Sequence, residues 1–96
     1  MSFEIKLTPE AEETFDAVIT QLRNRWGDKF VTKFENKISK SLDIISITPD
    51  IFPIVYENMQ IRRCLLHKNC SMLYKINNNT ILIVCFWDNR QEPLIF

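Results

Sequence analysis

The sequence predicts a single α+β domain over residues 1–96, in the order β-α-α-β-β-β, with a helical hairpin on one face of an antiparallel-rich sheet. Three observations support this class. Apolar residues recur at helical spacing in two stretches of the first half. Residues 61–87 instead form strand-like apolar runs. Between the two patterns, residues 49–58 contain two prolines, which favour a loop.

The first fifty residues predict a strand followed by two helices. Residues 3–7 alternate apolar and polar side chains, as a half-buried strand does. Thr8 and Pro9 predict a helix start, because threonine caps the first turn and proline suits the first helical position. Gly27, the only glycine, ends this helix. About two residues then lead into a second helix, which ends before Pro49, because a residue preceding proline avoids the α region.

The last third predicts a meander of three strands, at residues 61–66, 70–77 and 80–87. Asn77, Asn78 and Asn79 favour a tight turn between the last two strands, because asparagine tolerates the positive φ that hairpin turns require. Residues 81–87 are apolar throughout, so both faces of this strand must be covered. The helices can cover one face, and we expect a partner protein on the other.

The apolar stripes of the two helices define the expected core. A stripe of this kind is typical of a helix that buries one side. We expect both helices to pack on one sheet face, against alternate residues of the last two strands. The residues expected to meet there are Phe15, Val18, Ile19, Leu22, Phe34, Ile38, Leu42 and Ile45 from the helices, with Tyr74, Ile76, Leu82, Val84 and Phe86 from the strands.

The composition is that of an ordinary globular protein, with 46% hydrophobic and 25% charged residues. The formal net charge is zero, so no global attraction for nucleic acid is expected. Residues 61–96 nevertheless carry five basic and two acidic groups, so attraction for a polyanion would be local. No apolar stretch approaches the ~20 residues needed to cross a bilayer. The acidic N-terminus argues against a signal peptide, and we expect a cytoplasmic protein with no membrane partner.

Three cysteines, Cys64, Cys70 and Cys85, lack the C-x-x-C spacing of zinc sites and redox motifs. Each lies among apolar neighbours in a strand pattern, which favours a small buried hydrophobe. A zinc site would also need histidines, and His67 is the only one. We therefore expect no metal site and no cofactor.

Several short motifs occur in this chain in a characteristic order. They are residues 7–11 (LTPEA), Trp26-Gly27, residues 47–53 (ITPDIFP), Arg63 followed by Tyr74, and residues 86–93 (FWDNRQEP). In this order they resemble the RelE/ParE superfamily of toxins from bacterial type II toxin–antitoxin operons, over nearly the whole chain. The resemblance implies a growth-inhibiting, plasmid-stabilising toxin, neutralised by a cognate antitoxin protein that is encoded beside it.

The superfamily has two main activities with different chemical requirements. RelE-like members cleave messenger RNA in the ribosome, which needs a base, an acid and cations that stabilise the extra negative charge. ParE-like members inhibit DNA gyrase by binding it, and need no catalytic set. Nuclease members typically carry an arginine three residues before the tyrosine of the middle hairpin strand, where this chain has Ser71. Other nuclease members place a histidine or tyrosine near the C-terminus, whereas this chain ends in Leu94, Ile95 and Phe96.

These departures favour ParE-like inhibition of DNA gyrase. RelE-like cleavage of mRNA on the ribosome, or an inactive member that only binds an antitoxin, is the alternative. The residues that could bind the target or stabilise charge are Arg63, Arg90, Tyr74 and Lys68. No catalytic residue is assigned.

Each candidate also has an ordinary structural interpretation. Arg62 and Arg63 are consecutive in a strand, so they point to opposite faces, and the resemblance favours Arg63 for the site. Arg90 could form a surface ion pair, and Tyr74 could be a core residue with a satisfied hydroxyl. His67, in a turn, could act as a base near neutral pH or lie exposed in solvent. The lysines at positions 29, 33, 37 and 40 are expected to form a solvated helix face.

Overall fold

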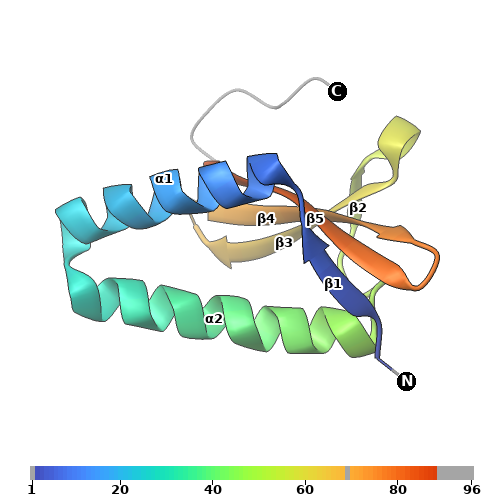
Figure 1. The fold of residues 1–96 in the computed structure, drawn as a ribbon, viewed down its shortest axis with the longest axis horizontal. Coiled ribbons are helices and arrows are strands. Elements are labelled where there is room, and N and C mark those ends of the chain that lie inside the picture. Colours follow the sequence, from blue (N-terminus) through green and yellow to red (C-terminus); the bar gives the residue numbers. More distant parts are fainter. Residues whose placement is uncertain (1, 69, 89–96) are drawn as a thin grey trace.

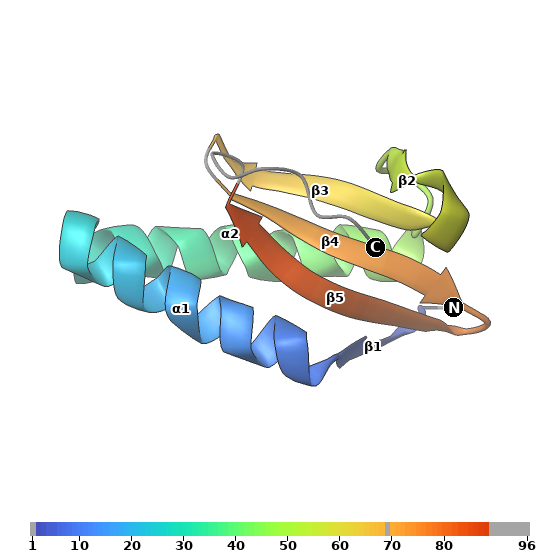
Figure 2. The same ribbon diagram turned by 90° about the horizontal axis from the view of Figure 1, so that it is seen from above.

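The computed structural model describes residues 2–68 and 70–88 of the chain. These residues form two helices on one side of a five-stranded sheet (Figure 1). Figure 2 shows the same two helices together on one side of β3, β4 and β5. The elements are β1 (Glu4–Leu7), α1 (Pro9–Trp26), α2 (Asp28–Ile47), β2 (Ile54–Tyr56), one 3₁₀ turn (Glu57–Met59), β3 (Ile61–His67), β4 (Cys70–Asn77) and β5 (Thr80–Asp88).

The sheet is mixed, with strand order β1-β5-β4-β3-β2. β1 runs parallel to β5, and the other three pairings are antiparallel, so the predicted α+β class with an antiparallel-rich sheet is confirmed. The prediction of a plain loop over residues 49–58 was wrong at one point, because β2 lies within it. β2 has only three residues and forms by pairing Ile54 with Arg62 of β3, a tertiary contact that no local pattern announces.

The helix boundaries follow the local signals in the sequence. Thr8 caps α1, since its hydroxyl accepts a hydrogen bond from the Ala11 N–H at 3.0 Å, and Pro9 is the first helical residue. A single residue, Gly27, joins α1 to α2, and its φ of 87° is one that glycine adopts without strain. Neither helix combines the length and the hydropathy that a membrane-spanning helix needs.

The main core lies between the helices and the sheet, as predicted. Two residues of α1, Ala11 and Ile19, and four apolar residues of α2 are buried in this cluster with residues of β4 and β5. The remaining stripe residues of α1 and α2, such as Phe15 and Leu42, are partly buried and pack against the same cluster. Phe15 contacts Phe86 across the interface, with ring centroids 5.3 Å apart. The buried residues of this cluster in α2, β4 and β5 include Val31, Phe34, Ile38, Ile45, Met72, Tyr74, Ile81, Ile83 and Phe86.

A bulge in β5 changes which side chains face the helices. Leu73 of β4 pairs with Cys85 while Tyr74 pairs with Ile83, so Val84 is an extra residue in β5. Ile81, Ile83 and Phe86 therefore face the helices, and the prediction that Leu82 and Val84 would do so was wrong. Thr8 holds the bulge, because its hydroxyl donates to the Val84 carbonyl at 2.7 Å.

A second, smaller cluster lies on the sheet face that turns away from the helices. Ile61, Leu73 and Cys85 form its buried part, with Trp87 and Tyr56 packed around them. The three residues are at most 2% exposed in the chain by itself, so no partner is needed to bury them. The expectation that a partner covers this face of the hairpin stays a prediction, because Leu65, which alternates with Arg63 on the same face, is 51% exposed. Other large exposed apolar side chains lie at the end of α2 and in the segment that follows.

Candidate functional site

The consecutive arginines of β3 point in opposite directions, as strand alternation predicts. Arg62 points to the helix side, where a terminal nitrogen donates to the carbonyls of Asp50 at 3.1 Å and Phe52 at 2.7 Å. Arg63 points to the other side, where its Nε donates to the Ser71 hydroxyl at 2.9 Å. Arg62 thus fastens the segment before β2, whereas Arg63 is exposed and available to another molecule.

We call the side of β3, β4 and β5 that turns away from the helices the outer sheet face. Its described polar side chains include Arg63, Ser71 and Lys75, because residues 71, 73, 75 and 77 alternate along β4, and Asn77 and its partner Thr80 lie at the far end of the same face. Arg63 pairs directly with Leu73, and Lys75 follows two residues later, so two cations flank an apolar floor. Ser71 is fully buried and orients the Arg63 side chain.

The described outward positions of β3, β4 and β5 hold two groups that can carry a transferable proton, Lys75 and Cys85. No aspartate, glutamate or histidine occupies these positions. Cys85 lies beneath this face, but burial raises the pKa of its thiol to about 11, so the thiol keeps its proton at neutral pH. The described part of the outer sheet face can therefore attract an anion, but it offers no carboxylate or imidazole as a general base.

Tyr74 lies on the opposite side of the sheet from Arg63. It is fully buried, and its hydroxyl donates to the Pro49 carbonyl at 2.7 Å. Its ring meets that of Phe52 edge-on, with centroids 6.5 Å apart. Burial raises the pKa of Tyr74 to about 12, against the opposing effect of the Arg62 charge. The structure therefore does not bring the two site candidates Arg63 and Tyr74 together, and Tyr74 anchors the segment after α2.

The other two candidates lie away from Arg63 or outside the described residues. Lys68 is exposed in the turn between β3 and β4. Arg90 lies outside the residues that the structure describes. His67, considered as a possible base, is turned toward the helices, where its ring meets that of Phe30 edge-on at 5.5 Å. It therefore does not share a surface with Arg63.

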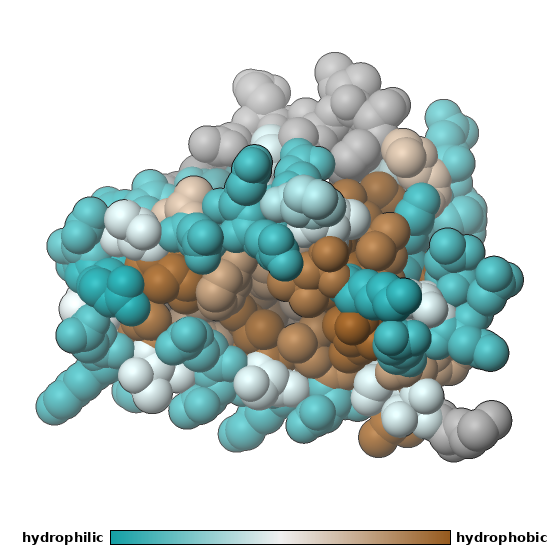
Figure 3. All heavy atoms as spheres, viewed as in Figure 1, coloured by the Kyte–Doolittle hydropathy of each residue, from teal (hydrophilic) through white to brown (hydrophobic). Residues whose placement is uncertain are grey.

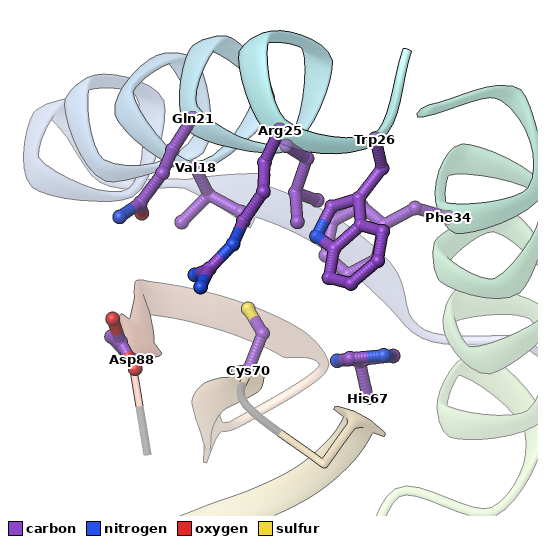
Figure 4. A pocket seen from close by; sticks show the side chains of 9 residues that line it. Val18, Gln21, Arg25, Trp26, Phe34, His67, Cys70 and Asp88 are labelled. Carbon is purple, nitrogen blue, oxygen red and sulfur yellow. The ribbon is translucent and has the colours of Figure 1, made fainter. Parts of the chain in front are cut away.

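A small cavity lies between the C-terminal part of α1, α2 and the ends of the strands (Figure 4). Its volume is about 30 Å³, enough for a single water molecule. Arg25 and Asp88 extend toward it from opposite walls, and the Cys70 thiol points into it (Figure 4). Burial raises the pKa of Cys70 to about 12, so this thiol is not a nucleophile at neutral pH. The cavity is too small for a substrate.

All three cysteines are buried and carry free thiols, as predicted. Within residues 2–68 and 70–88, no group of His, Cys, Asp and Glu is arranged to hold a metal ion.

Apolar surface is visible in the space between α1 and α2, bordered by hydrophilic side chains along both helices (Figure 3). Partly buried residues that pack against the core from these elements include Val18, Leu22 and Leu42. Further along, Ile44, Ile47 and Ile51 are 45%, 71% and 52% exposed. Exposed apolar groups of this kind commonly mark a surface for protein contact.

Comparison with solved structures finds the same fold in several bacterial toxins. The chain is similar to a structure of the chromosomal ParDE toxin–antitoxin system from P. aeruginosa, with a TM-score of 0.73, 16% identity and coverage of 91% of this chain and 96% of that one. The chain has the RelE/ParE toxin fold. No protein-family model matches the sequence, and no curated protein sequence matches it.

Two further structures share the RelE/ParE fold with this chain. A copper-bound mutant toxin from Helicobacter pylori has a TM-score of 0.65 at 11% identity, covering 92% of this chain and 96% of that one. The E. coli DinJ–YafQ toxin–antitoxin complex has a TM-score of 0.61 at 11% identity, covering 94% of this chain and 96% of that one. Such low identity establishes the fold, and residue roles must come from this chain itself.

Sequence reasoning identified Arg63 but missed the other features of the outer sheet face in this RelE/ParE fold. Lys75 shares the face because it alternates with Leu73, a signal that was present in the strand pattern. Trp87 pairs with Ser71 and borders the face. Its side could not be predicted, because a continuous apolar run does not show which residues point to which side of the sheet.

Proposed function

We propose that this chain is the toxin of a type II toxin–antitoxin pair, and that it acts in the cytoplasm by binding and inhibiting DNA gyrase, without catalysis. A cognate antitoxin neutralises it by direct binding. The fold supports the toxin role, because the similar structures are toxins, alone or with their antitoxins. The TM-score is higher for the ParDE system than for DinJ–YafQ, which favours the ParE-like reading over the RelE-like one.

One observation carries the choice of a non-enzymatic mechanism. Arg63 and Lys75 lie on the outer sheet face, and the described outward positions of β3, β4 and β5 around them hold no carboxylate and no imidazole. Cleavage of RNA needs a group that accepts a proton from the 2′-hydroxyl and another that donates one to the leaving oxygen. Binding to a protein target needs neither. Arg63 is bonded to Ser71, which pairs with Trp87, and this combination suits such an interface, since arginine and aromatic residues are enriched there.

RelE-like cleavage of mRNA on the ribosome is the second candidate. The same two cations favour it, because Arg63 and Lys75 would stabilise the negative charge that develops on a phosphate during cleavage. Under this reading the acid and the base come from outside the described outer sheet face. A third candidate is an inactive chain that binds only its antitoxin. It predicts neither inhibition of gyrase nor cleavage of mRNA.

Two assays on the purified chain separate these readings. We would measure supercoiling and cleavage-complex formation by DNA gyrase, and in parallel ribosome-dependent mRNA cleavage. Gyrase inhibition with intact mRNA supports the proposal. Cleavage within translated codons transfers the function to the RelE-like reading, and inactivity in both assays supports the inactive member.

Substitutions then test the residues assigned to the site. Arg63→Ala and Arg90→Ala should weaken gyrase inhibition in degree, whereas Arg25→Ala, an exposed arginine on α1, should leave it unchanged. For a nuclease, loss of a charge that stabilises the transition state should instead lower the cleavage rate by about 10²–10³-fold. Equal inhibition by the parent chain and Arg63→Ala would remove Arg63 from the site.

A further inference from the structure

The exposed side of α2 carries a continuous stripe of six residues, which we call the α2 stripe. Successive members are three or four positions apart, so they lie one above another along the helix. All six are exposed. The first two thirds of the stripe are basic, and the last third is apolar. Its residues are Lys29, Lys33, Lys37, Lys40, Ile44 and Ile47.

The order of charges in the α2 stripe is the reverse of the order that stabilises a helix. Lysines four residues apart, such as Lys29 and Lys33, repel each other and weaken the helix. Cations are unfavourable at the N-terminal end of a helix, where the backbone dipole is already positive. Lys29 lies in the first turn of α2, and the last turn carries no basic residue. The arrangement therefore disfavours the isolated helix, and an anionic partner opposite the lysines would offset that cost.

The chain itself does not neutralise these lysines. Within residues 2–68 and 70–88, none of the four forms an ion pair, and Asp28 at the start of α2 pairs instead with Arg23 of α1. Glu35 lies on a different side of the helix, and Asp43, which borders the stripe three residues after Lys40, forms no ion pair with it. Hydrophilic side chains line the outer border of α2 in Figure 3. Four like charges thus face solvent beside two exposed isoleucines.

We propose that the α2 stripe is the docking surface for an amphipathic helix of a partner protein, with acidic residues opposite the lysines and apolar residues opposite Ile44 and Ile47. Because it rests on the proposed toxin function, the inference assigns this helix to the antitoxin. The phosphates of a nucleic acid would attract the lysines, but its charged backbone offers no apolar groups to pack against Ile44 and Ile47. The stripe is about 27 Å long at 1.5 Å per residue, which a partner helix of about 18 residues would follow.

The test measures binding of the antitoxin encoded beside this chain to the full-length chain and three variants. Lys37→Glu replaces attraction with repulsion and should weaken binding by about 2–30-fold, more strongly at low than at high salt. Ile47→Ser should weaken it about tenfold or more, with little salt dependence. Lys6→Glu makes the same charge change at an exposed lysine of β1 and should leave the affinity unchanged. Thermal melts verify that each variant is folded.

Several results would overturn this proposal. Equal affinities for the parent chain, Lys37→Glu and Ile47→Ser would remove the α2 stripe from the interface, and failure of the antitoxin to bind the parent would remove the assigned partner. Duplex DNA or RNA that binds the parent but not Lys37→Glu, and ignores Ile47→Ser, would assign the stripe to nucleic acid. Growth arrest by the parent alone is measured separately. If the parent does not arrest growth, the toxin proposal is refuted, but the measured affinities still show whether the α2 stripe is the binding surface.

Discussion

Replacing Tyr74 with phenylalanine separates a structural role of this residue from a role in target binding. The hydroxyl makes one hydrogen bond, 2.7 Å to the Pro49 carbonyl, and the ring is fully buried in the core. Tyr74→Phe keeps the ring and removes only that bond. The net value of such a hydrogen bond is about 0.5–1.5 kcal/mol, and the free energy of unfolding should fall by that amount. For a domain of this size, each kcal/mol corresponds to roughly 4–8 °C in melting temperature.

Urea unfolding followed by circular dichroism measures this loss, and growth arrest in cells measures activity. The variant should unfold at lower urea with an unchanged m-value, and should still arrest growth at temperatures where it is folded. The reasoning would be refuted by a variant that is as stable as the parent but no longer inhibits growth. In that case the Tyr74 hydroxyl would serve the target and not the Pro49 carbonyl.

Two further predictions concern stability. Phe34 is buried in the core and only 4% exposed, so Phe34→Ala should lower the free energy of unfolding by about 3–5 kcal/mol. A urea melt that matches that of the parent would contradict the packing of Phe34 against the sheet. Stability should also fall at high pH, because burial raises the pKa of Cys70 to about 12 and of Cys85 to about 11, from an ordinary value of 9.0. The stabilisation is complete below pH 9.0 and is lost as the pH rises through these values, so melts over this range should show a shallower decline for Cys70→Ala.

Local signals in the sequence were sufficient for most of the fold. Thr8 and Pro9 set the start of α1, and Gly27 set its end, because caps and backbone preferences depend on neighbouring residues only. Two features escaped because they depend on contacts distant in the chain. β2 exists through its pairing with β3, and the bulge at Val84 is held by Thr8 from the other end of the sequence. In an unbroken apolar run, no polar residue shows where the bulge exchanges the two sides of the strand.

The candidate site was predictable where it follows from strand alternation. The opposite directions of Arg62 and Arg63 needed only the knowledge that they are consecutive in a strand. The direction of Tyr74 was open, because an aromatic residue with a polar tip suits either a core or an interface. The position of the Pro49 carbonyl, which accepts a hydrogen bond from the Tyr74 hydroxyl, shows that this residue belongs to the core. The burial of the second apolar cluster within the chain likewise could not be read from composition.

The parallel pairing of β1 with β5 imposes an order on folding during synthesis. Glu4 pairs with Thr80, and the Thr8 hydroxyl donates a hydrogen bond to the Val84 carbonyl. β1 therefore cannot join the sheet until β5 has been synthesised. Contacts this distant in sequence slow folding and cannot form until most of the chain has left the ribosome. α2, by contrast, emerges early and forms from local hydrogen bonds. A partner that recognises α2 could therefore engage a nascent chain whose sheet is still incomplete, before the outer sheet face has been assembled.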